Sequence, residues 1–322
     1  MTQLRSRHSR PSARTLGFSR GLGSATLFHD LPRRHAASPP RAAGLRASGV
    51  ARAFTLVELL VVVSIIAVLV TLVTVAAGAV RGAGSAAKEL ALGRSLMTAF
   101  VAYATDNRGT LMPGYYNVQP PLGSVTDAQG NPITGQGAYR YPWRLAPYLD
   151  YNLAGLVQDK WLLDDLHYTN QFNYFVSLYP SLGMNSAFIG GDSSAEGMGF
   201  DPVYEQQYGR FYMTRLAQPK RPADLIVFGS ARTNAPYEPG APPVIEGYFR
   251  IESPYMLDRR WDLSWNPDAP PKQWGFVSMR LKPRKAAFAF LDGHTGYLDD
   301  GEVQDMRRWC DLATRPDWKL GE

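Results

Sequence analysis

Sulfur and imidazole side chains are scarce in this chain of 322 residues, which contains one cysteine and five histidines. The single cysteine, Cys310, excludes an intrachain disulfide. Only His167 and His294 lie beyond residue 53, so a transition-metal site there would depend largely on carboxylates. The sequence also lacks a Gly-x-Ser-x-Gly motif, a P-loop and a dinucleotide-binding glycine pattern, and it therefore indicates none of the enzyme classes that these motifs define.

Charged residues are absent from the run Leu59 to Val80. A helix of that length is about 33 Å long, and the hydrocarbon core of a bilayer is roughly 30 Å thick. Its polar members, Ser64, Thr71 and Thr74, can hydrogen bond back to the helix backbone. The alternative is a core helix of a soluble domain, but such helices seldom remain uncharged over about six turns. The run predicts a membrane-spanning helix over residues 54–80.

One carboxylate, Glu58, directly precedes this uncharged run. An acidic residue at the centre of a membrane helix costs about 2.5 to 3.5 kcal/mol, so an intramembrane acid is a candidate functional residue. Two explanations are open from the residue alone. Glu58 pairs with a cation inside an apolar environment, or its side chain extends to the lipid headgroups without a partner.

Residues 1–53 contain no lysine, ten arginines and a single acid, Asp30, which gives this leader a net charge of +9. The rest of the chain has 24 basic and 27 acidic residues, so the overall charge of +6 does not predict a nucleic-acid partner. The positive-inside rule predicts a cytoplasmic leader and an exported chain beyond Val80. We expect residues 1–53 to be removed, or to lie upstream of the true translation start, with Val50 as the candidate if its codon is GTG.

The segment Ala53-Phe54-Thr55-Leu56-Val57-Glu58-Leu59-Leu60-Val61-Val62 resembles the N-terminal signal of type IV prepilins and type II secretion pseudopilins. The resemblance implies that a prepilin peptidase cleaves between Ala53 and Phe54 and methylates the new amine. Ala53 departs from the usual glycine, although it is also small. A conventional peptidase site at residues 77–79 is the competing site. In a fibre, the Glu58 carboxylate would pair with the amine of a neighbouring subunit and fix the stagger between subunits.

Apolar residues continue beyond Val80 with a helical period. The residues that share this face are Leu92, Leu96, Ala99 and Tyr103. We therefore expect one continuous helix from Phe54 to about Thr105, with residues 81–106 packed on a globular domain of residues 107–322. The predicted fold class is α+β: a long N-terminal helix packed on a loop-rich, antiparallel, pilin-like β-sheet domain. Strands are expected at residues 225–229, 244–251, 274–279 and 286–291.

Asp292, Gly293 and His294 follow the last of these expected strands. Because Asp-Gly between apolar runs is a strong signal for a tight turn, we expect a β-hairpin here. The alternative is that Asp292 and His294 are metal ligands or an acid–base pair. The nearby carboxylates Asp299, Asp300 and Glu302 could bind calcium, although a solvated turn is the commoner explanation.

The chain also resembles the large pilin-like proteins of planctomycetes and verrucomicrobia. The segments that carry this second resemblance are residues 143–149, 181–185, 221–224 and 290–294. Those proteins have a C-terminal motif of a histidine, nine residues and Asp-Gly. Lys282 occupies the histidine position here, so the role of that histidine is not transferred to this chain.

Together the two resemblances imply a structural subunit of a type IV pilus-like or type II secretion fibre, and not an enzyme. The implied partners are prepilin peptidase, other pilin or pseudopilin subunits, the inner membrane and the secretion or pilus machinery. The expected location is the inner membrane, with the N-terminus cytoplasmic and the C-terminal domain periplasmic until the subunit joins a fibre. No cofactor is expected apart from the possible calcium. The alternatives are a single-pass anchored binding protein that does not polymerise and, behind it, a hydrolase that uses Asp292 and His294.

Overall fold

The computed structural model describes residues 55–119, 122–166, 171–235, 242–281 and 284–322. The chain divides into two compact units, Met1–Leu59 and Leu60–Glu322. The first unit is described only from Thr55 onward. The second unit combines helices with antiparallel strands, which confirms the predicted α+β class.

The first element, α1 (Leu56–Asp106), is a helix of 51 residues and is therefore about 77 Å long. The expected continuous helix is thus present, and it ends within a residue of the predicted position. Arg108 and Gly109 terminate it, because their φ angles of 56° and 79° lie in the left-handed region. The Gly109 N–H donates to the Ala104 carbonyl at 2.7 Å, which satisfies one of the carbonyls left free at a helix C-terminus.

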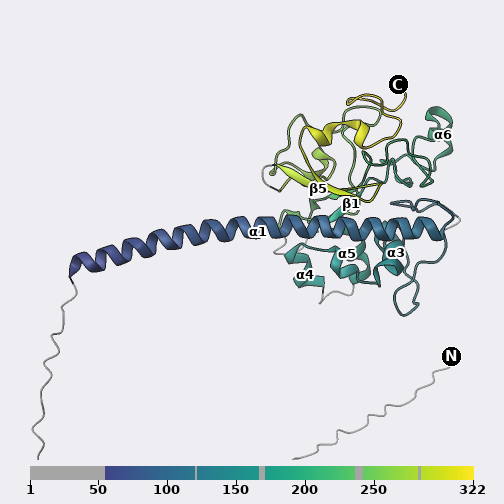
Figure 1. The fold of residues 1–322 in the computed structure, drawn as a ribbon. Helices are drawn as coiled ribbons and strands as arrows, with labels where there is room; N and C mark the ends of the chain where they lie inside the picture. The colour runs from purple at the N-terminus through teal and green to yellow at the C-terminus, as the bar shows by residue number, and fades with distance from the viewer. Residues whose placement is uncertain (1–54, 120–121, 167–170, 236–241, 282–283) are drawn as a thin grey trace, which may run out of the picture. The chain divides into compact units, whose positions relative to one another are not determined.

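Short helices follow α1 along the chain. The α-helices are α2 (Gln136–Tyr139), α3 (Tyr141–Leu145), α4 (Lys160–Leu166), α5 (Phe172–Leu178) and α6 (Pro202–Tyr208). The 3₁₀ helices are η1 (Ala146–Leu149), η2 (Leu153–Leu156), η3 (Pro271–Trp274), η4 (Glu302–Gln304) and η5 (Met306–Arg308). Figure 1 shows α3, α4 and α5 on one side of α1, with β1 and β5 on the other.

The main sheet has four antiparallel strands in the order β1-β2-β5-β6. The strands are β1 (Leu182–Met184), β2 (Ile226–Ser230), β5 (Lys285–Phe290) and β6 (Thr295–Asp299). In register, Gly229 lies between Gly183 of β1 and Phe288 of β5. A second sheet pairs β3 (Thr233–Asn234) with β4 (Val244–Ile245). Strands were correctly expected at 225–229 and 286–291.

The other two strand predictions are wrong over most of their length. Of residues 244–251, only Val244 and Ile245 form a strand, and the rest make one bridge, from Arg250 to Met184. Residues 274–279 form no named strand, because Trp274 ends a 3₁₀ helix and only Val277 makes a bridge. Both segments are apolar because they are buried, and burial alone does not require a ladder of strand hydrogen bonds.

Two hydrophobic clusters lie on opposite faces of the main sheet. On one face, Leu96, Met97 and Phe100 of α1 are almost fully buried, and the Phe100 ring meets the Phe228 ring edge to face at 5.9 Å. On the other face, a second cluster gathers Phe288 with tryptophans from the 255–280 region and the C-terminal segment. The sheet is thus covered on both faces, and α1 provides one cover.

Candidate functional site

The N-terminus of α1 is closed by Thr55 and Glu58. The Thr55 Oγ1 accepts a hydrogen bond from the Glu58 N–H at 3.2 Å. In return, the Glu58 Oε2 accepts from the Thr55 N–H and from the Thr55 hydroxyl, both at 2.9 Å. This reciprocal arrangement is a capping box, which satisfies backbone donors that have no partner within the helix. Glu58 therefore already has a local role within one subunit.

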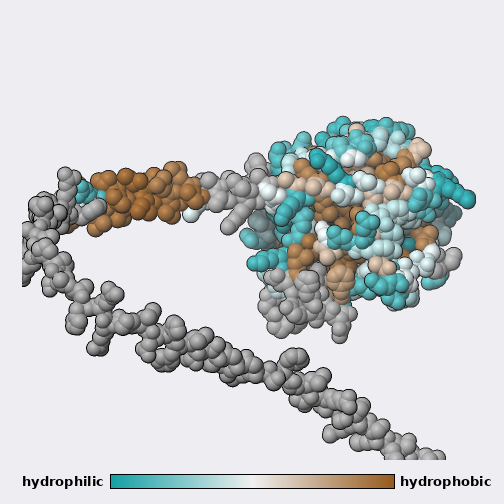
Figure 2. Space-filling view, turned by 60° about the horizontal axis from the view of Figure 1, so that its bottom comes forward, coloured by the Kyte–Doolittle hydropathy of each residue, from teal (hydrophilic) through white to brown (hydrophobic). Residues whose placement is uncertain are grey.

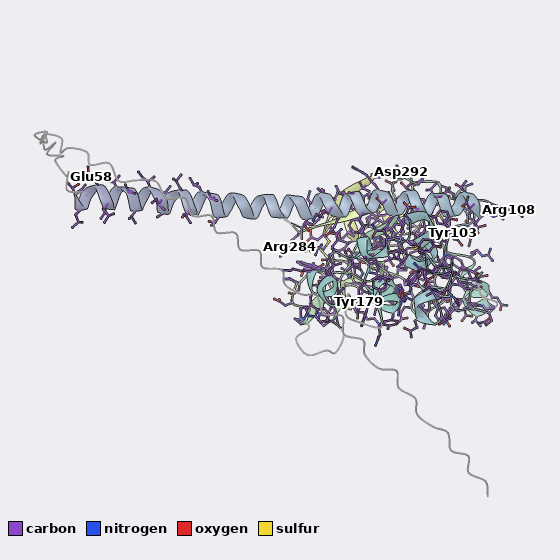
Figure 3. The ribbon with its side chains drawn as sticks, turned by 90° about the horizontal axis from the view of Figure 1, so that it is seen from below. Glu58, Tyr103, Arg108, Tyr179, Arg284 and Asp292 are labelled. Carbon is purple, nitrogen blue, oxygen red and sulfur yellow. The ribbon has the colours of Figure 1, made fainter. Side chains whose placement is uncertain are left out.

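The capping box uses only one oxygen of the Glu58 carboxylate. Within the described residues, Glu58 Oε1 accepts no hydrogen bond, and the side chain is exposed. Figure 3 shows Glu58 at the beginning of α1. The geometry therefore leaves one oxygen of the Glu58 carboxylate accessible to a cation while the cap remains intact.

Residues Leu56–Thr74 of α1 form a stretch that is long and apolar enough to cross a membrane. Its large hydrophobic side chains are exposed, and Figure 2 shows a continuous hydrophobic surface along this part of the helix. The hydroxyls of Ser64, Thr71 and Thr74 donate to backbone carbonyls three or four residues earlier at 2.8 to 2.9 Å. These bonds satisfy the hydroxyl donors within the helix, as the sequence predicted.

The proposed processing residues, Ala53 and Phe54, lie outside the described residues, as do leader residues 1–52. His167 and Lys282 also lie outside them. The processing site therefore remains a prediction from sequence.

Asp292, Gly293 and His294 form the turn between β5 and β6, which confirms the predicted hairpin. Gly293 has a φ of 93°, a conformation that its missing Cβ permits. Burial alone would raise the pKa of the Asp292 carboxyl, but hydrogen bonds from the His294 backbone and ring lower it. The ring nitrogen lies 2.6 Å from Asp292, and the imidazole stacks on Phe290 at 4.2 Å. Both side chains are therefore engaged in contacts within the hairpin.

The possible calcium ligands Asp299, Asp300 and Glu302 close the end of β6. The Asp299 Oδ1 accepts from the Glu302 N–H at 2.9 Å, and the Glu302 Oε2 accepts from the Asp299 N–H at 3.0 Å. Asp300 lies 3.7 Å from Arg284. Throughout the part of the chain that the structure describes, no three His, Cys, Asp or Glu side chains gather as a metal-binding group. The calcium hypothesis thus gains no geometric support.

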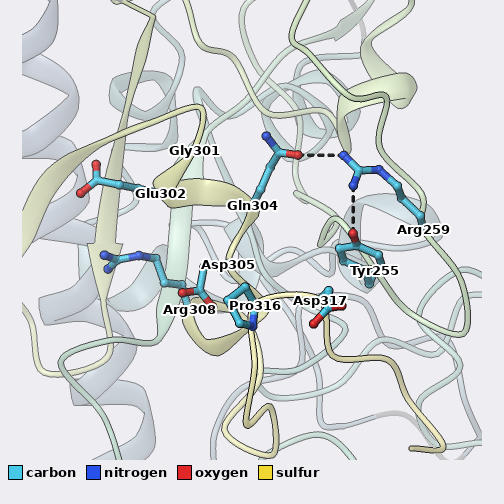
Figure 4. Close-up of a pocket in the computed structure, with 9 residues that line it drawn as sticks. All are labelled: Tyr255, Arg259, Gly301, Glu302, Gln304, Asp305, Arg308, Pro316 and Asp317. Atoms are coloured by element: carbon cyan, nitrogen blue, oxygen red, sulfur yellow. Dashed lines mark hydrogen bonds between the residues drawn. The ribbon is translucent and has the colours of Figure 1, made fainter.

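A pocket of about 490 Å³ lies near the C-terminus. Its lining residues are Tyr255, Arg259, Gly301, Glu302, Gln304, Asp305, Arg308, Pro316 and Asp317. In Figure 4, the Arg259 guanidinium donates to the Tyr255 hydroxyl at 2.9 Å and to the Gln304 side-chain oxygen at 2.8 Å. One of the two guanidinium groups that line this pocket, that of Arg259, is therefore already bonded within the protein. Asp292 and His294 do not line it.

Glu89 is a buried carboxylate of α1 that the sequence pattern did not reveal. It is 1% exposed and accepts hydrogen bonds from the Ser230 hydroxyl of β2 and from the Arg280 guanidinium. Arg280 also lies 3.4 Å from Glu246. Glu89 is three residues before Leu92 and hence on the same helical face. A charge on an otherwise apolar face is the signal that could have identified it.

Comparisons with known proteins bear on the N-terminal region only. The family profile described as the prokaryotic N-terminal methylation motif matches residues 50–74. No curated protein and no solved structure matches the chain. The matched residues include the capping box and the exposed apolar stretch of α1. Residues 50–74 of the chain are therefore similar to this methylation motif, in agreement with the resemblance to the prepilin signal.

Proposed function

We propose that this protein is a structural subunit of a type IV pilus-like or type II secretion fibre. The observation that carries the proposal is the methylation motif at residues 50–74, which coincides with a helix able to cross a membrane. In this proposal, prepilin peptidase cleaves between Ala53 and Phe54. Before assembly, the subunit resides in the inner membrane with its N-terminus in the cytoplasm. Residues 107–322 form the periplasmic domain, which faces outward in the fibre.

Assembly would transfer the exposed apolar face of residues 56–74 from lipid to the same faces of neighbouring subunits. Lipid is as apolar as leucine, so close packing and polar contacts, more than hydrophobic burial, must select the correct alignment. Glu58 supplies such a contact, because its Oε1 is not used by the capping box. Pairing this oxygen with the Phe54 amine of a neighbouring subunit would make a misaligned subunit costly in the low dielectric of a helix bundle.

Two variants separate pairing from capping. Glu58→Gln removes the charge, yet glutamine at this position still completes a capping box. Thr55→Val does the opposite, since it removes the capping hydroxyl and keeps the carboxylate. We expect Glu58→Gln to insert into the membrane but to be lost from sheared fibres on immunoblots, whereas Thr55→Val is incorporated. Loss of both variants to the same extent would show that Glu58 acts only as a cap.

Mass spectrometry of the mature protein tests the processing step. An N-terminal methyl-Phe54 is the expected result, and a chain that begins after residue 79 would instead show cleavage by a conventional signal peptidase.

A single-pass anchored binding protein is the second candidate function, because the described surface includes pockets. If the protein is an anchored binding protein, Glu58→Gln should bind its ligand as well as the unchanged protein does in the membrane. The protein should then be absent from fibre preparations. Peptidase processing alone would not distinguish the two candidates, so incorporation into fibres is the deciding measurement.

A further inference from the structure

A pocket of about 230 Å³ lies between the loop that follows α1 and the segment that leads into α3. Its lining is mainly apolar and aromatic, and it includes Tyr116, Val125, Ile133, Ala138, Tyr139 and Arg144. Such a lining with one charged group is typical of small-molecule sites, in which a few polar groups fix the orientation of a ligand. The volume is below the roughly 300 to 1,000 Å³ of typical ligand pockets, so only a small ligand would fit.

Arg144 is the charged group of this pocket, and its bonding within the protein is weak. The residue is 9% exposed. Its Nη1 donates to the Leu122 carbonyl at 3.4 Å and its Nη2 to the Tyr116 carbonyl at 3.5 Å, both near the limit for a hydrogen bond. Its Nε is buried and has no hydrogen-bond partner among the described residues.

Arg144 also lacks a carboxylate partner among the described residues, unlike Arg250 and Arg280 of the same chain. Arg250 lies 3.7 Å from Asp192, and Arg280 pairs with Glu89. Burial lowers the pKa of the Arg144 guanidinium, and only the hydroxyls of nearby tyrosines oppose this effect. An arginine side chain nevertheless stays protonated in proteins. A buried charge with no counter-ion is unfavourable, and an anionic ligand would compensate it.

Lack of an acidic partner alone does not identify a site, as two further arginines show. Arg140 has no carboxylate among the described residues, but it donates to Ser177 at 3.1 Å and to Gln136 at 2.8 Å. Arg232 donates to backbone carbonyls at 2.7 and 2.9 Å. Of these arginines, Arg144 combines missing acidic partners with long hydrogen bonds and a position in the wall of a pocket.

We propose that this pocket binds a small organic carboxylate, with Arg144 holding the carboxylate group. A planar guanidinium matches a carboxylate through two parallel hydrogen bonds. The side chains of Val125, Ile133 and Tyr139 would then contact the apolar or ring part of the ligand, which favours an organic anion over inorganic phosphate. This activity goes beyond assembly, since it assigns a ligand to the outer domain of the subunit.

Calorimetric titration of the full chain in detergent tests the proposal with matched pairs of probes. Benzoate is compared with neutral benzamide, and glucuronate with glucose, while inorganic phosphate serves as an anion without an organic body. We expect at least one carboxylate to bind about tenfold or more tightly than its neutral counterpart, since hydrogen bonds to charged groups contribute that much. If neither carboxylate binds more tightly than its neutral counterpart, or if phosphate binds as tightly as both, the proposal is wrong.

Two variants locate the binding. Arg144→Gln should weaken binding of the carboxylate by about tenfold or more. Arg210→Gln is the matched control, because its side chain is 57% exposed and the same charge is lost there. Ser124→Trp places a bulky ring at an exposed position of the pocket rim and should also weaken binding. If Arg144→Gln does not fold, Ser124→Trp tests whether the carboxylate binds in this pocket. Unchanged affinity in Ser124→Trp would overturn the proposal.

Discussion

Along α1, residues 60–74 and residues 89–104 belong to one helix but differ in what surrounds their side chains. In the first stretch, the large hydrophobic residues are 44% to 66% exposed. In the second, Leu96, Phe100 and Ala104 are completely buried against the sheet and the short helices. The apolar side chains of the first stretch are thus largely uncovered among the described residues, whereas those of the second are buried within the chain. The substitutions below test this difference from the largest expected effect to the smallest.

Replacement of Phe100 by alanine should have the largest effect. Its ring packs against Phe228 and is 0% exposed, so Phe100→Ala should lower the free energy of unfolding by about 3 to 5 kcal/mol. Denaturant titration in detergent measures this change by tryptophan fluorescence, since all seven tryptophans lie beyond residue 142. The control Leu69→Ala should change stability by less than about 0.5 kcal/mol. Equal losses from the two variants would contradict the contrast between the two stretches.

Removal of the buried carboxylate of Glu89 should have the next largest effect. Glu89→Ala removes the closer acceptor of the Ser230 hydroxyl, which keeps the Ala287 carbonyl at 3.3 Å, and it deprives Arg280 of one of its two acidic partners. We expect a loss of about 3 kcal/mol, the lower end of the range for a broken buried ion pair, because Arg280 keeps Glu246. The adjacent Lys88 is exposed, and Lys88→Ala should be nearly neutral in the same fluorescence titration. If Glu89→Ala left the free energy of unfolding unchanged, the contacts of Glu89 with Ser230 and Arg280 would not stabilise the packing of α1 on the sheet.

Enlargement of glycines in α1 should give the smallest effect, with opposite signs in the two variants. A Cβ at Gly93 would lie 3.2 Å from both Ala289 and Thr295, so Gly93→Leu should destabilise by about 1 to 2 kcal/mol through overpacking. A Cβ at Gly84 would meet nothing within 4 Å, and Gly84→Leu should stabilise the helix by about 0.5 to 1 kcal/mol. Circular dichroism during thermal unfolding would record both shifts. A gain from Gly93→Leu would mean that α1 can move away from the sheet.

Local signals in the sequence predicted much of the fold. The uncharged run and the helical spacing of Leu92, Leu96 and Tyr103 placed α1, and Asp292-Gly293 placed the hairpin between β5 and β6. The strands at 244–251 and 274–279 were expected in error, because these segments are apolar through burial in irregular loops. Periodicity reports that a side chain is covered, but it does not report whether the backbone pairs with a neighbouring strand.

The candidate sites also differ in whether the sequence alone could predict them. Thr55 and Glu58 are three residues apart, so their capping box follows from sequence spacing alone. Glu89 and Arg280 are 191 residues apart, and the partners that Arg144 lacks are defined only by what the fold places around it. No pattern along the chain could reveal either environment, because each depends on contacts between distant segments.

The sequence by itself determined that this chain has a methylation motif, a membrane-length apolar helix with one acid at its start, and an α+β class. These properties depend on neighbours within a few residues, where helix geometry and hydrophobicity act directly. Only the tertiary structure decided which part of α1 is buried, which groups pair with Glu89, and that Arg144, without a carboxylate partner among the described residues, lines a pocket. Those outcomes depend on burial and on long-range pairing, because the free energy of a charge is set by everything that surrounds it.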